Sequence, residues 1–420
     1  MISKLKNKSH YTKNILTLMT GTTMAQAIPI AIMPVLTRLY TPEEFGVLAL
    51  FIAITAILGS ISNGRYELAI MLPEKDEDAI NVAALGLLIS VALSLLILIV
   101  VFLFNQEITV LLGNDTIGIW LYLVPFMVLA TGTFNVLNYL NTRKKEFKNV
   151  ATAMVYKSVA AGVIQLSFGV AKAGVIGLIS GHFISQLFAI FRLAKNINVT
   201  YRLQSVSKGE ILSQGKRYID FPKYSMWAIL ANSLSFNFAN ILVSTYYSIV
   251  TLGFYSLAQK ILYMPASLIG RSIGQVFFQE AAREKKETGK AINTFNKTSK
   301  GLLLLSCFMF VPLYFILPIV FELVFGKEWR LAGEYGQILL PFIAIQFVAS
   351  SMSNLNNVFE KQKIALLWQL GLLVITMVTF FTSQAFGLAM ESYLMVNSSV
   401  LFFYYLLLLM ILRKVSKGEI

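Results

Sequence analysis

The sequence predicts an all-α integral membrane protein with twelve spanning helices in two six-helix bundles. Hydrophobic residues make up 56% of the chain and charged residues only 13%, which leaves too little polar surface for a soluble protein of this length. The apolar runs 79–104 and 364–381 reach the roughly 18–20 residues that a spanning helix needs. They are far longer than the roughly 10-residue alternating segments of a membrane barrel. The spans are therefore expected to be helices, which satisfy their own backbone hydrogen bonds in lipid.

Hydropathy places the first spanning helix at 14–37 and eleven more after it. The N-terminus resembles a secretory signal, with four lysines before an apolar stretch and Ala25 to Ala27 after it. The apolar stretch continues beyond Ala27, so we expect an uncleaved first helix. The others are expected at 45–71, 79–104, 117–142, 150–170, 173–194, 222–246, 251–281, 298–323, 335–359, 362–386 and 391–412.

The longest polar segment separates the first six predicted helices from the last six. We expect an N-terminal bundle at 1–195, a cytoplasmic linker at 196–221 and a C-terminal bundle at 222–420. The loops on the other side of the membrane are short. No domain outside the membrane is therefore large enough to hold an active site on that side.

Lysine and arginine are unevenly divided between the two sides of this topology. The tails and even-numbered loops hold 27 of the 35 basic residues, whereas the opposite loops hold only Arg38, Lys172, Lys327 and Arg330. The positive-inside rule therefore predicts a multi-pass inner-membrane protein with both termini in the cytoplasm. The same asymmetry explains the net charge of +14 without a nucleic-acid partner.

The two halves contain matched residues in the same order, which predicts parallel internal repeats. The pairs are separated by 207 to 216 positions. They are Tyr40 with Tyr247, Gly46 with Gly253, Gly113 with Gly326, Pro125 with Pro341, Asn138 with Asn354, Asn141 with Asn357, and Lys145 with Lys361.

Four basic residues fall inside predicted spans: Arg65, Lys157, Lys260 and Arg271. A charge at membrane depth costs at least about 2.5–3.5 kcal/mol, so it normally faces a cavity or a partner. Near a helix end it instead extends to the interface, and for Lys157 the two interpretations are equally balanced. Arg38 lies at the end of the first helix and either anchors the interface or meets a ligand there.

Polar residues line one side of the predicted seventh and eighth helices. On the eighth they fall within an arc of about 100°, and Pro265 is expected to bend that helix. Interhelical packing is an alternative explanation for the polar residues of the seventh helix. The proposed cavity-lining residues are Ser233, Asn237, Asn240 and Ser244 on the seventh helix, and Ser256, Ser267 and Gln275 beside Lys260 and Arg271 on the eighth.

Arg65 and Arg271 occupy similar places in their halves, 19 residues after Gly46 and 18 after Gly253. Two cations related by the repeat favour an anionic ligand at the interface of two bundles, and the guanidinium group matches phosphate oxygens well. Glu67 is expected to point away from Arg65, as an intrahelical charge or a coupling carboxylate, and we favour the structural role. Pro29 and Pro34 make the first helix a further bending element.

Metal and cofactor sites are not expected. The chain has one cysteine, Cys307, and two histidines, His10 and His182, which have no ligand cluster at metal-binding spacing. The sequence contains no Walker-type nucleotide motif. We therefore predict neither metal, cofactor nor enzymatic activity.

Two segments closely resemble the opening of Wzx-type O-antigen and polysaccharide flippases. These are the stretch from Pro34 to Gly46, PVLTRLYTPEEFG, and the stretch from Asn63 to Glu67, NGRYE. The GFYSLA segment from Gly253 to Ala258 and the six-plus-six layout extend the resemblance over nearly the whole chain. These flippases share a superfamily with the multidrug and toxin extrusion (MATE) transporters.

The resemblance implies a MATE-like pair of bundles around a cationic cavity lined by helices one, two, seven and eight. The implied cargo is an undecaprenyl-pyrophosphate-linked oligosaccharide, moved between leaflets by alternating access. Implied partners are the bilayer, a polysaccharide polymerase and a chain-length regulator. A multidrug exporter of the same superfamily and a membrane-embedded polymerase are the rival interpretations.

Overall fold

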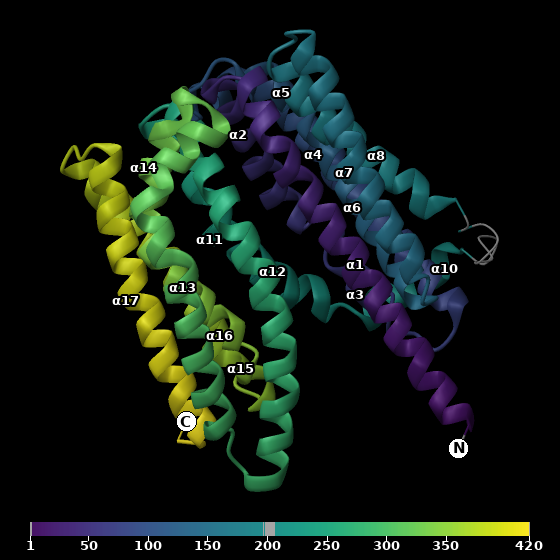
Figure 1. The fold of residues 1–420 in the computed structure, drawn as a ribbon. Coiled ribbons are helices and arrows are strands. Elements are labelled where there is room, and N and C mark those ends of the chain that lie inside the picture. The colour runs from purple at the N-terminus through teal and green to yellow at the C-terminus, as the bar shows by residue number, and fades with distance from the viewer. Residues whose placement is uncertain (1, 196, 198–205, 420) are drawn as a thin grey trace. The chain divides into compact units, whose positions relative to one another are not determined.

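The computed structural model of this chain describes residues 2–195, 197 and 206–419, with side chains from Thr20 onward (Figure 1). Positions 196 and 198–205 of the predicted linker lie outside the described residues. Every regular element in the described part is a helix. The chain divides into two compact units, Met1–Ile249 and Val250–Ile420, and each unit is described by itself.

Unit 1 is built from long antiparallel helices joined by short turns. Helix α1 packs on α7, α7 on α8, α4 on α6, and α11 on α2. The elements are α1 (Ile2–Leu39), α2 (Pro42–Ser60), α3 (Tyr66–Ala69), α4 (Asp76–Leu111), α5 (Ile117–Leu121), α6 (Val124–Arg143), α7 (Phe147–Val170), α8 (Val175–Ala194), α10 (Lys208–Arg217), the π-helix η2 (Phe221–Ser225) and α11 (Met226–Tyr246).

Unit 2 is organised around α14, which packs against both α13 and α17. Helix α12 starts at the last residue of unit 1 and continues through unit 2. The elements are α12 (Ile249–Thr288), α13 (Ile292–Phe325), the 3-10 turn η3 (Lys327–Trp329), α14 (Arg330–Met352), α15 (Leu355–Val358), α16 (Gln362–Ala385) and α17 (Met390–Lys417).

The lengths and apolar surfaces of these helices confirm the membrane class. Ten candidate spans in the described residues are long and apolar enough to cross a membrane. Helices α1 and α12, predicted as the first and eighth spans, are not among these ten, although their 38 and 40 residues exceed the roughly 20 that span a bilayer. Large apolar side chains point outward, with Phe102 of α4 73% exposed and Phe308 of α13 80% exposed. Such side chains find an apolar solvent in lipid.

Two turns of unit 1 recur in unit 2 with the same backbone geometry. Lys145 and Glu360 both have a left-handed φ, of 61° and 58°, and lie 215 positions apart. In the first turn the N–H of Glu146 donates to the carbonyl oxygen of Asn141, and in the second Lys361 donates to Asn356. Lys172 and Gly387 repeat this relation, again 215 positions apart, with φ of 53° and 62°. The parallel repeat is therefore present in the structure.

The recurring turn also corrects the predicted register of the repeat by one residue. Asn141 matches Asn356 and Lys145 matches Glu360, whereas the sequence paired them with Asn357 and Lys361. Burial supports the correction, because Asn141 is 5% exposed and Asn356 is 4% exposed, while Asn357 is exposed. Adjacent asparagines are indistinguishable by residue type alone.

The predicted second helix, 45–71, was wrong as a single element. Helix α2 ends at Ser60, a turn follows, and the short α3 begins at Tyr66. Gly64 and Arg65 both adopt a left-handed backbone, with φ of 57° and 66°. Asn63 precedes them, and an asparagine–glycine pair is a strong turn signal.

Asn63 holds this turn against two neighbouring helices. Its Nδ2 atom lies 2.8 Å from Ser90 Oγ, and 3.2 Å from the carbonyl oxygens of Gly86 and Gly132. Ser90 in turn donates to the carbonyl oxygen of Ser62 at 2.9 Å. A Cβ atom at Gly132 would lie 2.2 Å from Ser90 Oγ, so only glycine permits this close approach of α6. Ser90 thereby satisfies the carbonyl oxygen of Ser62 beside the helix break, inside unit 1.

We predict that Asn63→Ala lowers the thermal stability of the detergent-solubilised protein. The substitution removes a buried donor that joins α2, α4 and α6, at a cost of about 1–3 kcal/mol. Fluorescence-detected thermal unfolding measures the change. Asn357→Ala is the matched control, because Asn357 is exposed and a surface substitution changes stability by less than about 0.5 kcal/mol. Equal melting temperatures for both variants would contradict the role of Asn63.

Candidate functional site

Arg65 lies at the turn between α2 and α3, outside both helices. Its Nη1 atom is 3.0 Å from Glu67 Oε1, and its Nε atom is 3.4 Å from Ser225 Oγ. The side chain of Arg65 is 21% exposed and that of Glu67 is 5% exposed. Arg65 is therefore a partly accessible cation whose charge has a buried partner.

The expectation that Glu67 points away from Arg65 was wrong. In a continuous helix, residues two apart face different directions. The left-handed backbone of Arg65 interrupts the helix and lets the two side chains meet. Glu67 Oε2 has no hydrogen-bond partner and is buried, and Tyr139 lies close enough to interact electrostatically with both charges.

Part of the predicted linker contacts α3, which follows this turn, and the first part of α4. The Tyr66 hydroxyl donates to the carbonyl oxygen of Gly215 at 2.8 Å, and the N–H of Ser207 donates to Asn81 Oδ1 at 3.1 Å. Ser225, which contacts Arg65, belongs to η2, just after the predicted linker and inside the range 222–246 that was predicted as the seventh helix. The sequence did not predict these contacts, because no local pattern indicates which helices a linker will touch.

The polar residues of α11 divide into two groups. Ser233 and Ser244 are buried, and their hydroxyls donate to the carbonyl oxygens of Ala56 at 3.2 Å and Leu112 at 3.5 Å. These contacts are the interhelical packing that the sequence left open as the alternative. Asn237 and Asn240 are half-buried, and Asn240 Oδ1 has no hydrogen-bond partner.

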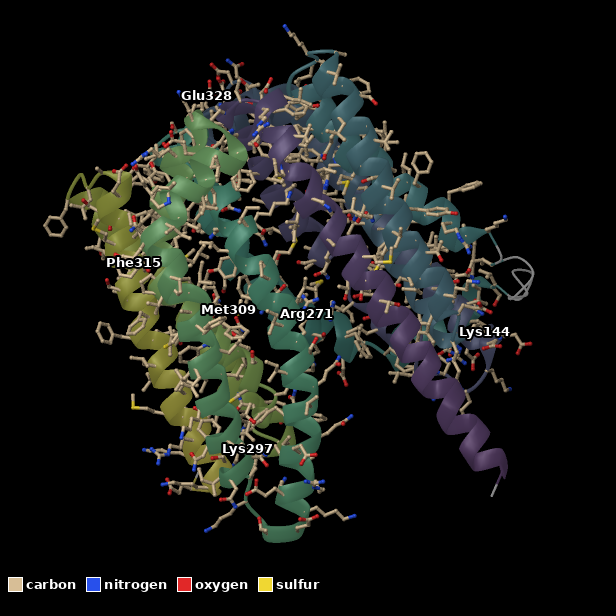
Figure 2. The ribbon with its side chains drawn as sticks, in the orientation of Figure 1. Lys144, Arg271, Lys297, Met309, Phe315 and Glu328 are labelled. Atoms are coloured by element: carbon tan, nitrogen blue, oxygen red, sulfur yellow. The ribbon has the colours of Figure 1, made fainter. Side chains whose placement is uncertain are left out.

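The polar stripe of α12 lies outside the face that packs into unit 2. Lys260, Arg271 and Gln275 are exposed, whereas Leu262 and Phe277 on the packing face are 3% and 2% exposed. Figure 2 labels Arg271 on this helix. Ser256 and Ser267 are half-buried, and each donates to a carbonyl oxygen three residues earlier, at 3.0 Å.

Helix α12 approaches α14 closely at two of its glycines. A Cβ atom at Gly270 would lie 2.8 Å from Ser351 Oγ, and one at Gly274 would lie 2.8 Å from the carbonyl oxygen of Ser351. Within the described residues, Lys260 and Arg271 form no ion pair with a carboxylate. Unit 2 therefore presents two uncompensated cations on one helix face.

The three predicted bending prolines lie inside uninterrupted helices. Helix α1 contains Pro29 and Pro34, and α12 contains Pro265. Arg38 is exposed in the last turn of α1. Lys157 is half-buried on α7, with Nζ 5.7 Å from the centroid of the Phe134 ring. An aromatic face at this distance stabilises a cation.

Arg65 and Arg271 belong to different units and differ in local geometry. Arg65 follows a helix break, whereas Arg271 lies within the continuous α12. Their predicted equivalence therefore does not extend to the backbone. In the described residues, no group of three or more His, Cys, Asp or Glu side chains is placed to hold a metal ion.

Comparisons with known proteins match this chain at the level of family and fold. A family model described as "Polysaccharide biosynthesis protein" matches residues 35–333. The succinoglycan biosynthesis transport protein ExoT of Rhizobium meliloti is 22% identical over 313 residues, which are 71% of this chain and 59% of that protein. The chain therefore spans well under two thirds of that relative's length.

Solved transporter structures share the fold over almost the whole chain. The lipid II flippase MurJ, in an inward closed conformation, has a TM-score of 0.72 at 13% identity and covers 95% of this chain and 87% of its own. An inward-facing MATE family multidrug resistance transporter of the MOP superfamily has a TM-score of 0.67 at 17% identity, over 94% and 96%. A MOP superfamily transporter from Pyrococcus furiosus has a TM-score of 0.55 at 16% identity, over 96% of both chains.

These findings confirm the predicted MATE-like fold and the family-level resemblance. The long apolar helices and the transporter fold together indicate a multi-pass membrane protein. Since the family model spans more than half of the sequence, the chain belongs to the polysaccharide biosynthesis protein family.

Proposed function

We propose that this protein is a flippase for an undecaprenyl-pyrophosphate-linked oligosaccharide repeat unit. It would carry this unit from the cytoplasmic to the periplasmic leaflet for O-antigen or other surface polysaccharide synthesis. The observation that carries the proposal is the pair of cations, Lys260 and Arg271, exposed and without a carboxylate partner in the described chain. Membership of a polysaccharide biosynthesis family supports it.

The cargo sets a clear physical requirement. A diphosphate and its glycan are strongly hydrated and do not enter hydrocarbon unaided, whereas a lipid tail does. A transporter therefore needs polar, positively charged surface at membrane depth, and such charges are costly unless they serve a ligand. The guanidinium of Arg271 supplies paired donors that fit phosphate oxygens, and Lys260 adds a second positive charge.

Arg65 is a weaker candidate for the pyrophosphate than Arg271. Its charge is already balanced by Glu67 at 3.0 Å. A guanidinium has five N–H donors. The contacts of Arg65 with Glu67 and Ser225 involve only its Nη1 and Nε atoms. Arg65 therefore retains donors for an oxygen ligand, but an anion there also meets the charge of Glu67.

The contacts within each unit support the proposed topology. In unit 1, Arg143 Nη1 donates to the carbonyl oxygen of Ile70 and Asn141 Nδ2 to that of Leu193, both at 3.1 Å. These contacts bring together the loops that the charge asymmetry assigns to the cytoplasm. In unit 2, the N–H of Ala291 donates to the carbonyl oxygen of Ser416 at 2.8 Å, which joins the α12–α13 loop to the basic C-terminal end of α17.

The mechanism that we propose is alternating access between six-helix halves at 1–195 and 222–420. The lobes would rock around the bound pyrophosphate, with bending at Pro29, Pro34 and Pro265. Helix α11 belongs to the second half in this scheme, although its contacts with α2 place it in unit 1. Because α11 packs on the first half and directly follows the linker, it is well placed to move relative to either half.

A multidrug exporter would require a carboxylate that is free to bind a cationic drug. Glu67 is a buried carboxylate, but Arg65 already neutralises it. The exposed ionic groups of the polar stripe on α12, Lys260 and Arg271, are both cationic, which favours an anionic cargo. The flippase proposal therefore accounts for the charges better than the exporter does.

We predict that Arg271→Ala and Lys260→Ala each reduce polysaccharide export by about tenfold or more. A hydrogen bond to a charged group contributes about 1.5–3 kcal/mol, and about 1.4 kcal/mol corresponds to a factor of ten. Complementation of a flippase-deficient strain, normalised to membrane protein level, measures the effect. Lys286→Ala, an exposed cation outside the stripe, is the matched control. Full export by both stripe variants would contradict the proposal.

A second prediction separates the structural and ligand-binding roles of Arg65. Arg65→Ala leaves the buried Glu67 without its partner and is expected to lower thermal stability by about 1–3 kcal/mol. Arg65→Ala with Glu67→Gln removes both charges and is expected to recover most of that stability. If Arg65 also contacts cargo, the stable double variant still exports poorly. Normal export by the double variant would limit Arg65 to a structural role.

A further inference from the structure

Unit 2 contains a groove of about 610 Å³ between α12 and α13. The two helices are antiparallel and are joined by the loop at 289–291. The lining residues farthest from that loop are apolar, namely Ile273, Val276, Phe277 and Leu302. Those nearest to it are polar or charged, namely Glu280, Arg283, Asn293, Thr294, Lys297 and Thr298. Glu280 pairs with Arg283, so Lys297 gives this end a net positive charge. The groove is therefore apolar at one end and polar, with a net positive charge, at the other.

The carboxylates near the groove already have partners. Glu280 pairs with Arg283, and Glu284 accepts hydrogen bonds from the backbone N–H groups of Asn293 at 3.0 Å and Thr294 at 2.7 Å. Burial raises the pKa of Glu284, but its hydrogen bonds with Thr294 and Asn293 outweigh this and lower the pKa below the usual value of a glutamate. Glu284 thus stays ionised and caps α13. Lys297 has no carboxylate partner among the described residues.

The change from cationic to apolar lining coincides with the start of the long apolar run of α13. Lys297 and Lys300 are the last charged residues before that run, and no charge follows until Glu322. Figure 2 shows Lys297 toward the loop end of α13 and Phe315 farther along the same helix. On the proposed topology the groove therefore crosses the boundary between headgroups and hydrocarbon on the cytoplasmic side.

We propose that this groove is a binding site for an anionic phospholipid of the cytoplasmic leaflet, separate from the transported cargo. The phosphate lies between Lys297 and Arg283, and the hydroxyls of Thr294 and Thr298 supply neutral donors. An acyl chain lies along Val276, Phe277 and Leu302. Basic pockets between spanning helices on the cytoplasmic side suit such headgroups, and the volume is in the range of small-ligand sites.

The proposed lipid would contact α12, the helix whose polar stripe carries Lys260 and Arg271. Lys285 Nζ on the same part of α12 contacts the carbonyl oxygen of Val358 at 2.7 Å, which fixes this end of α12 to α15. A lipid between α12 and α13 adds a contact on another side. Its occupancy is therefore expected to stabilise the position of α12 within unit 2.

Gly301 provides a way to close the groove without disturbing the fold. It lines the groove, and a Cβ atom added there meets nothing within 4 Å. Gly301→Phe places a ring in this open space, whereas Gly301→Ala adds one methyl group. Both changes remove an interior helix glycine, so neither is expected to weaken α13.

The test measures lipid-dependent thermal stability of the purified full-length protein in neutral detergent. Phosphatidylglycerol is expected to raise the melting temperature more than phosphatidylcholine does. Lys297→Ala, Arg283→Ala and Gly301→Phe are each expected to raise the phosphatidylglycerol concentration for half-maximal stabilisation by about tenfold or more. Gly301→Ala and Lys286→Ala, which lies outside the groove, are expected to behave as the parent.

Several results would overturn the site. These are equal stabilisation by the two lipids, an unchanged phosphatidylglycerol response in the folded lysine and arginine variants, or full displacement of the lipid by soluble glycerol phosphate. Native mass spectrometry of lipid adducts gives a second readout if the Gly301→Phe variant fails to fold. Because the readout is binding rather than transport, failure here leaves the proposed flippase function standing. Loss of the flippase function would likewise leave this result unchanged.

Discussion

The constraint behind the whole structure is that hydrocarbon does not solvate charge or free backbone groups. The protein meets it differently in its two units. In unit 1, Arg65 is paired with Glu67, and Asn63 joins the helix break beside it to backbone carbonyl oxygens of α4 and α6. In unit 2, Lys260 and Arg271 have no such compensation among the described residues. The energetic cost of an uncompensated charge on a long membrane helix is offset if a ligand of opposite charge binds there.

The same constraint explains why function concentrates on α12. Small residues let its packing face approach α14 closely, through Gly270 and Gly274 against Ser351. This packing fixes the direction of the polar stripe. Beyond the stripe, the same helix continues to Arg283 and Lys285. One helix thus carries both the proposed cargo contacts and the proposed lipid groove.

The sequence predicted features that depend on local length and composition. Helices α7 and α8 were expected at 150–170 and 173–194, and the structure gives Phe147–Val170 and Val175–Ala194. It did not predict features that depend on distant contacts. The break before Arg65 arises from Asn63 reaching α4 and α6, and the Arg65–Glu67 pair follows from that break. For Ser233 and Ser244, spacing alone did not distinguish a cavity lining from the interhelical packing that the structure shows.

In the proposed function, positive charge on the helices accompanies a pyrophosphate across the bilayer. The most direct measurement is transbilayer movement of fluorescent polyprenyl-linked sugars in vesicles containing the purified protein. Matched substrates would carry a pyrophosphate, a single phosphate or a neutral linkage. We expect the fastest movement for the pyrophosphate-linked sugar and little for the neutral one. Equal movement of all three, or movement of the neutral substrate alone, would contradict it.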